Sequence, residues 1–124
     1  MSRWRAVSLG TLALMFVGAG IAHFVRPEPF EAIVPPALPA KRSLVYLSGV
    51  AEVLGGLGLL FRKTRRAAGW GLLALLVAVF PANVYMATAA ERFAHLAPTW
   101  ALWARLPLQP LLMLWVWATA VRDR

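Results

Sequence analysis

The sequence predicts an all-α protein, specifically a four-helix transmembrane bundle with both termini in the cytoplasm. The 124-residue chain is 60% hydrophobic and 15% charged, whereas soluble domains carry about 25% charged residues. Its mean hydropathy is +0.66. The charged residues gather between apolar runs, and a helix rising ~1.5 Å per residue needs about 20 residues to cross the ~30 Å hydrocarbon core of a bilayer. Four runs approach that length.

Composition also limits the function. The formal charge of +8 does not indicate nucleic-acid binding, because the basic residues flank apolar spans instead of forming one basic face. The chain contains no cysteine, which excludes a dithiol mechanism, a thiolate metal site and an internal disulfide. Residues 1–124 are too few for a second domain of ordinary size, so we expect one transmembrane domain.

The first span covers about residues 4–25. Arg3 and Arg5 lie at its start, and Gly20-Ile21-Ala22 resembles a signal-peptide cleavage site. The apolar run is longer than the ~7–15 residues of a signal-peptide core, so we expect an uncleaved helix. His23 lies near the far end of this span.

A proline-rich loop follows at residues 26–42. Its five prolines fix the backbone φ angle and remove hydrogen-bond donors, so we expect no regular helix there. The loop also carries the apolar residues Phe30, Ile33, Val34 and Leu38. These residues indicate a loop that folds onto the mouth of the bundle or lies in the membrane interface.

The second span, about residues 43–61, contains one ionisable residue, Glu52, near its middle. A carboxylate at the membrane midplane costs at least ~2.5–3.5 kcal/mol, so it normally faces protein or water, pairs with a cation, or carries a proton. At about 100° per residue, the small residues Ser48, Gly49, Gly55 and Gly56 share its side of the helix. Such a face lets a neighbouring backbone approach closely, which places Glu52 inside the bundle.

The third and fourth spans cover about residues 67–88 and 100–121. The third contains Pro81 and Asn83. The fourth carries Arg105 and Gln109 on one face and is interrupted by two prolines. Its tryptophans are expected near the two membrane interfaces, where amphipathic rings accumulate; they are Trp100, Trp103, Trp115 and Trp117.

The orientation follows from the basic residues, because cytoplasmic loops of membrane proteins carry an excess of lysine and arginine. One side of the bundle holds Arg3, Arg5, Arg62, Lys63, Arg65, Arg66, Arg122 and Arg124. The other side holds Arg26, Lys41, Arg42 and Arg92. This asymmetry predicts a multi-pass protein of the cell inner membrane with the proline-rich loop outside.

Five segments occur in order along nearly the whole chain: Gly20-Ile21-Ala22-His23-Phe24, Ile33-Val34-Pro35 through Leu38-Pro39, Ser48-Gly49-Val50-Ala51-Glu52, Phe80-Pro81-Ala82-Asn83-Val84-Tyr85-Met86, and Arg105-Leu106-Pro107-Leu108-Gln109. Together they resemble the DoxX-like family of small membrane proteins. The resemblance implies a four-helix transmembrane bundle. Some relatives look like membrane subunits of thiosulfate:quinone oxidoreductases, some belong to oxidative-stress complexes, and animal relatives act as receptor-assembly chaperones. The family also resembles the membrane half of thiol-redox enzymes, and the lack of cysteine departs from that chemistry.

The candidate ligand-binding or proton-relay residues are Glu52, His23, Asn83, Arg105 and Gln109. If the helices alternate in direction, all of them lie in the outer half of the membrane. We therefore expect one polar cleft that opens outward under the proline-rich loop. Structural roles stay open beside this one. Glu52 and Arg105 form an ion pair in one alternative, and Asn83 and Gln109 only bridge helices in another.

Two classes of function follow, with a third behind them. In the first, an accessory or membrane subunit of a quinone-linked redox system binds a lipophilic ligand in the cleft. Glu52 and His23 then supply protons, and a soluble or membrane partner protein supplies electrons. In the second, a non-catalytic assembly or chaperone protein binds another membrane protein. The third is small-solute or proton transport, for which we expect a homo-oligomer.

The residues establish no cofactor and no catalytic group, and quinone is the candidate ligand. His23 and His95 are the only histidines, and a haem held by both is a weak alternative. The chain has no HExxH motif, no phosphate-binding glycine loop followed by lysine, and no serine nucleophile elbow. We therefore expect no metal site, and whether the protein is an enzyme stays open.

Overall fold

The computed structural model describes residues 1–122, and this part of the chain is helical without any strand. Arg124, counted above for the orientation, lies outside the described residues. The helices are α1 (Arg3–Val25), α2 (Pro27–Ala32), α3 (Lys41–Leu60), α4 (Arg65–Thr88), the 3₁₀ helix η1 (Ala90–Phe93), α5 (Thr99–Val116) and the π-helical end η2 (Trp117–Val121). The prediction of an all-α protein is confirmed.

Three helices, α1, α3 and α4, are long and apolar enough to cross a membrane. The fourth long helix, α5, has 18 residues and continues directly into η2. It contains Arg105, Gln109 and two prolines, Pro107 and Pro110.

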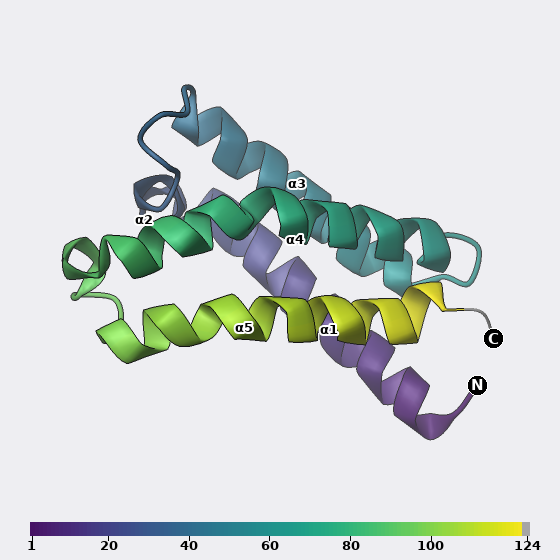
Figure 1. Cartoon of the computed structure of the whole chain (residues 1–124). Coiled ribbons are helices and arrows are strands. Elements are labelled where there is room, and N and C mark those ends of the chain that lie inside the picture. Colours follow the sequence, from purple (N-terminus) through teal and green to yellow (C-terminus); the bar gives the residue numbers. More distant parts are fainter. Residues whose placement is uncertain (123–124) are drawn as a thin grey trace.

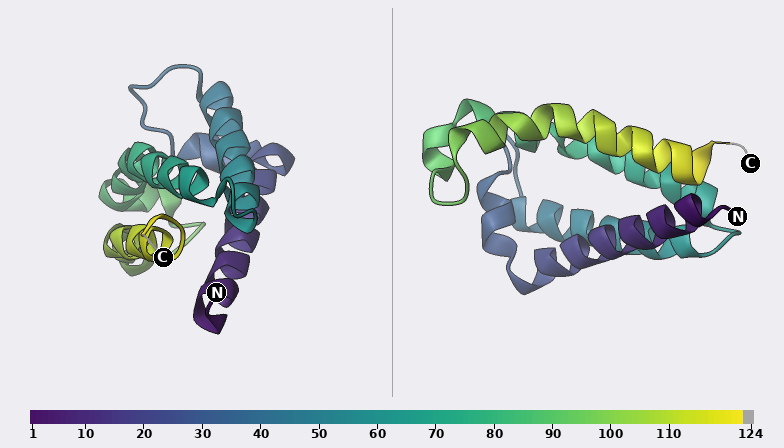
Figure 2. Two further views of the ribbon diagram at one scale, coloured as in Figure 1. Left: turned by 90° about the vertical axis from the view of Figure 1, so that its right-hand side faces the viewer. Right: turned by 90° about the horizontal axis from the view of Figure 1, so that it is seen from below.

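The long helices form two pairs, α1 with α3 and α4 with α5 (Figure 1). Both termini lie at one end of the molecule, and α2 and η1 lie at the other end (Figure 1). In the right-hand view of Figure 2, the two pairs converge at the end of the termini and diverge toward α2, which stands between them. The molecule is therefore wedge-shaped, and its wide end is partly closed by the α2 segment.

The hydrophobic core fills the narrow part of the wedge. Each long helix contributes a side chain that is almost fully buried: Leu12, Leu59, Leu72 and Val116. A smaller cluster of Met86, Phe93 and Leu102 joins α4, η1 and α5 near the wide end. Large apolar side chains remain exposed along the outer surface, as expected for helices surrounded by lipid.

Helices α1 and α3 cross in close contact through glycine residues. A Cβ atom added to Gly20 would lie 2.6 Å from the carbonyl oxygen of Gly49 and 3.0 Å from the backbone nitrogen of Val53. A Cβ added to Gly49 would lie 2.8 Å from the Cβ of His23. The small face predicted around Glu52 therefore serves for close helix packing.

The proline-rich loop contains a short helix, α2, where the prolines were expected to prevent one. Pro27 and Pro29 both fall in its first turn. The amide groups of a first helical turn have no partner within the helix, so proline is tolerated there. Arg42 at the start of α3 ties this helix down with two bonds to Oε2 of Glu31, from Nε at 2.9 Å and from Nη2 at 2.6 Å.

We predict that Gly20→Ala lowers the free energy of unfolding by about 1–3 kcal/mol, because the added methyl group meets backbone atoms that cannot move independently. Gly18→Ala is the matched control in the same helix. Its added Cβ meets no atom within 4 Å. It should be neutral or stabilise by up to about 1 kcal/mol, the helix-propensity gain of alanine over glycine. Unfolding in detergent micelles, followed by circular dichroism, measures both. Equal stabilities of the two variants would contradict the close crossing.

Candidate functional site

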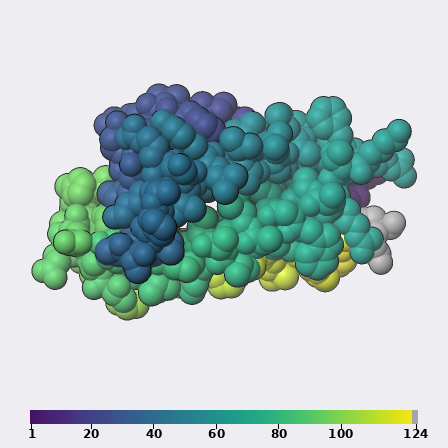
Figure 3. All heavy atoms as spheres, turned by 90° about the horizontal axis from the view of Figure 1, so that it is seen from above, coloured from purple at the N-terminus to yellow at the C-terminus, as the bar shows by residue number. Residues whose placement is uncertain are grey.

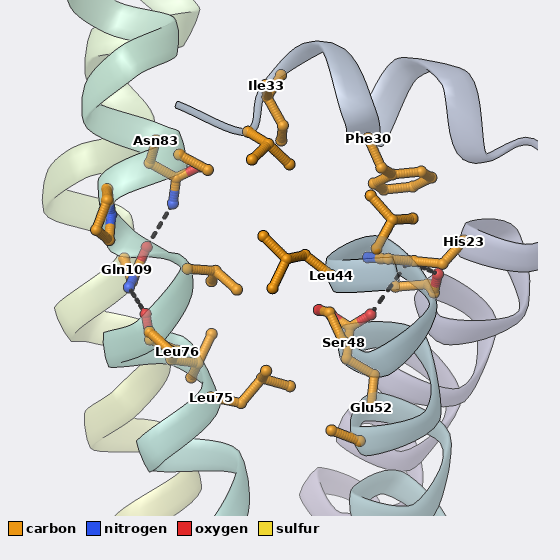
Figure 4. Close-up of a pocket in the computed structure, with 18 of the residues that line it drawn as sticks. His23, Phe30, Ile33, Leu44, Ser48, Glu52, Leu75, Leu76, Asn83 and Gln109 are labelled. Carbon is orange, nitrogen blue, oxygen red and sulfur yellow. Dashed lines mark hydrogen bonds and ion pairs between the residues drawn. The ribbon is translucent and has the colours of Figure 1, made fainter. Parts of the chain in front are cut away.

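A cavity of about 860 Å³ lies between the two helix pairs at the wide end of the wedge. All five polar candidates, Glu52, His23, Asn83, Arg105 and Gln109, line it. Most of the other lining residues are aliphatic or aromatic. Figure 4 shows two polar groups facing each other across this apolar space, His23 with Glu52 on one wall and Asn83 with Gln109 on the other.

His23 of α1 is buried and fixed on two sides. Its Nδ1 lies 2.6 Å from the carbonyl oxygen of Ala19, one turn earlier in the same helix. A carbonyl oxygen can only accept, so Nδ1 carries the proton of this hydrogen bond. The ring of Phe30, from α2, stacks on the imidazole at a centroid distance of 3.9 Å. The α2 segment thus folds onto the cavity mouth, one of the two positions predicted for the loop.

Glu52 of α3 lies beside His23, with Oε2 3.3 Å from Nδ1. This distance fits an ion pair if the imidazole is protonated. The single Nδ1 proton is directed at Ala19, however, so Oε2 is buried without any hydrogen bond. A buried oxygen without a partner is costly, because it has lost its contact with water. Glu52 is therefore ready to accept a proton from a ligand or to receive a hydrogen-bond donor.

The alternative in which Glu52 pairs with Arg105 is wrong for this structure. The ionisable group next to the acid is His23, and Arg105 is an exposed side chain on the α5 wall of the cavity. The reason is the packing order. The glycine crossing holds α1 directly against α3, whereas α5 lies across the cavity from α3.

Asn83 and Gln109 bridge α4 and α5. The side-chain amide of Asn83 donates to Oε1 of Gln109, and Nε2 of Gln109 donates to the carbonyl oxygen of Leu76 in α4. Gln109 is buried. These bonds agree with the helix-bridging role considered for both residues. They use both ends of the Gln109 amide but leave the side-chain oxygen of Asn83 available on the cavity wall.

The aromatic residues Phe30 and Trp115 line the cavity but were not identified as site residues from the sequence. Phe30 was noted only as an apolar loop residue, although it covers His23. Trp115 was assigned to a membrane interface, yet it lines the cavity and is half-buried. Trp115 follows Leu112 by three residues and Leu108 by seven, and both leucines also line the cavity. This helical spacing was the sequence signal that could have placed Trp115 on the cavity face.

The cavity opens to the outer surface of the molecule. Several of its lining residues are also largely exposed, including Leu47 at 67% and Leu111 at 60%. Figure 3 shows an opening between the blue segment that precedes α3 and the green surface of α4. A ligand could therefore enter from the side, between the helix pairs.

Metal-binding groups do not gather in this region. Within residues 1–122, no three histidine, aspartate or glutamate side chains come together. His95 is exposed in the turn after η1 and does not line the cavity that contains His23.

A family model described as a domain of unknown function, DUF8561, matches residues 12–120. The chain belongs to the DUF8561 family. The matched range includes all five polar candidates, so the cavity lies within the part that defines a DUF8561 protein. No curated protein and no solved structure matches the chain. The resemblance to the DoxX-like family stays a prediction.

We predict that Gln109→Leu in this DUF8561 protein lowers the free energy of unfolding by about 1–2 kcal/mol, because Asn83 and the Leu76 carbonyl both lose a partner. The double variant Asn83→Leu with Gln109→Leu should recover part of this loss, since the amide of Asn83 is then no longer left unpaired. A double-mutant cycle measured by unfolding in micelles tests the bridge. A purely additive cycle would mean that the two amides do not interact.

Proposed function

We propose that this DUF8561 protein is a DoxX-like, four-helix protein of the cell inner membrane with both termini in the cytoplasm. Three helices of suitable length and hydropathy support the membrane placement. The fourth span would be α5 with η2, together 23 residues from Thr99 to Val121. Exposed tryptophans near both ends of the molecule support the same placement, because their rings favour the interfaces.

The orientation is supported by charge. Seven of the described basic residues lie at the end that holds the termini: Arg3, Arg5, Arg62, Lys63, Arg65, Arg66 and Arg122. The wide end of the wedge carries Arg26, Lys41, Arg42 and Arg92, with three glutamates among them in α2 and η1. The cavity then opens in the outer half of the bilayer.

Cysteine labelling tests this orientation without background labelling of the protein itself, because the chain has no cysteine of its own. A cysteine at the exposed position Pro36 (Pro36→Cys) should react in intact cells with a maleimide that cannot cross membranes. Lys63→Cys, at the opposite end, should react only after the membrane is permeabilised. The reverse pattern, or equal labelling of both, would refute the orientation.

The cavity's proposed ligand is a lipophilic ring that carries polar oxygens, of the quinone class. The single observation that carries this proposal is the cavity itself. It has an apolar interior of about 860 Å³ with polar groups on two opposing walls, which suits a flat apolar ring with an oxygen at each end. Glu52 on one wall can accept a proton from a hydroxyl group. On the other wall, Arg105 can donate to a carbonyl oxygen, and the side-chain oxygen of Asn83 can accept from a hydroxyl group.

The same groups would support a role as an accessory or membrane subunit of a quinone-linked redox system. Reduction of a quinone to a quinol takes up two electrons and two protons. Glu52 and His23, 3.3 Å apart, form a route by which protons reach the cavity. No described side chain carries electrons in steps, so a partner protein would supply them.

We expect a quinone, as quinone or quinol, to co-purify with the wild-type protein at a near-stoichiometric ratio. In Glu52→Gln the bound amount should fall at least about tenfold, because the neutral amide can neither take the proton of a quinol hydroxyl nor pass a proton to a quinone oxygen. The measurement is solvent extraction of the detergent-purified protein followed by chromatography and mass spectrometry. Glu28→Gln is the matched control, since Glu28 is an exposed carboxylate that does not line the cavity.

A second variant tests ligand binding in the cavity without changing the carboxylate of Glu52. Leu75→Trp fills the cavity from α4 and leaves Glu52 in place, so it should also release the ligand. Circular dichroism confirms that both variants fold. If the wild-type protein contains no lipophile and instead carries another membrane protein at constant ratio, the ligand proposal fails and the assembly or chaperone function takes its place.

A further inference from the structure

A second cavity, of about 260 Å³, lies at the narrow end of the wedge, away from the proposed ligand site. Five arginines line it together with two apolar residues of η2. The lining residues are Arg5, Arg62, Arg65, Arg66, Ala120, Val121 and Arg122. They come from the start of α1, the turn between α3 and α4, the first residues of α4, and the end of η2 with its C-cap. We call this group the arginine pocket.

Two of these arginines are fixed by backbone carbonyls. Nε of Arg5 donates to the carbonyl oxygen of Thr119 at 2.9 Å. Nε of Arg65 donates to that of Leu59 at 2.8 Å. Carbonyls in the last turn of a helix lack amide partners, so these bonds cap α3 and η2. They also hold both half-buried guanidinium groups in place, which reduces the ordering cost of binding a ligand.

The arginine pocket has a large excess of positive charge. Among residues 1–122, no acidic side chain lines it. The four glutamates of the chain lie elsewhere, Glu52 in the main cavity and Glu28, Glu31 and Glu91 at the wide end. Asp123 lies outside the described residues. The pocket therefore favours an anion that brings more than one acceptor oxygen.

We propose that the arginine pocket binds a phosphate group, supplied by the headgroup of an anionic membrane lipid. Arginine side chains match phosphate because the planar guanidinium fork donates two parallel hydrogen bonds. The lipid source is favoured by the surroundings. Trp4, Trp70 and Trp117 are exposed at the same end of the molecule, where amphipathic rings mark the level of lipid headgroups. The site is independent of the ligand proposed for the main cavity.

The test titrates the detergent-solubilised protein with dihexanoyl phosphatidylglycerol, with dihexanoyl phosphatidylcholine and with inorganic phosphate in 150 mM salt, using thermophoresis. We expect one saturable site for phosphatidylglycerol. Arg62→Gln with Arg66→Gln should weaken binding by roughly 30-fold, as expected for two basic groups near an anionic headgroup. Arg5 and Arg65, which cap the helices, remain in this variant.

The matched control is Arg3→Gln with Lys63→Gln, which removes the same charge from the same end but from residues outside the arginine pocket. Charges farther than ~8 Å are largely screened at this salt concentration, so we expect a loss below about threefold. Equal losses in the two double variants, or binding that does not saturate, would overturn the proposal. Inorganic phosphate binding as tightly as phosphatidylglycerol would support the phosphate site and overturn the lipid source.

Discussion

The close crossing of α1 and α3 is the constraint on which the rest of the structure depends. Lipid tails are as apolar as leucine, so helices in a bilayer gain little from burying apolar side chains and rely on close packing. Gly20 and Gly49 allow the two backbones to touch. His23 follows Gly20 by three residues, and Glu52 follows Gly49 by three residues. The crossing therefore brings the imidazole and the carboxylate together on one wall of the cavity.

The opposite wall is held by a different force. Helices α4 and α5 are joined near the cavity by the amides of Asn83 and Gln109 rather than by small residues. The two walls pack against each other in the core at the narrow end, where each long helix contributes a buried side chain. At the wide end, Ile33 of the α2 segment packs against the cluster of Met86, Phe93 and Leu102, and the cavity lies between the walls. The cavity is a consequence of two locally stable helix pairs that diverge.

Periodicity and composition predicted the helical class, the approximate bounds of the long helices and the small-residue face of α3. They also placed the polar residues of the spans in one region. What they could not supply was the partner of each polar group. Depth along a helix says how far Glu52 lies from the surface, but only the packing order says whether α1 or α5 is next to it. The short helix α2 was not predicted, because prolines were expected to prevent a helix anywhere in the loop. Two of them fall in the first turn of α2, where proline is tolerated.

The lateral opening changes how occupancy of the main cavity should be understood. If the protein spans the membrane as proposed, a ligand that enters between the helix pairs is already dissolved in the surrounding lipid, so its mole fraction among the lipids, and not its concentration in water, governs binding. Each methylene of an apolar tail adds about 0.8 kcal/mol to partition into the bilayer without touching the protein. Analogues that share one headgroup will therefore differ in apparent affinity by their tails alone, and a weak intrinsic contact is sufficient to keep the cavity filled.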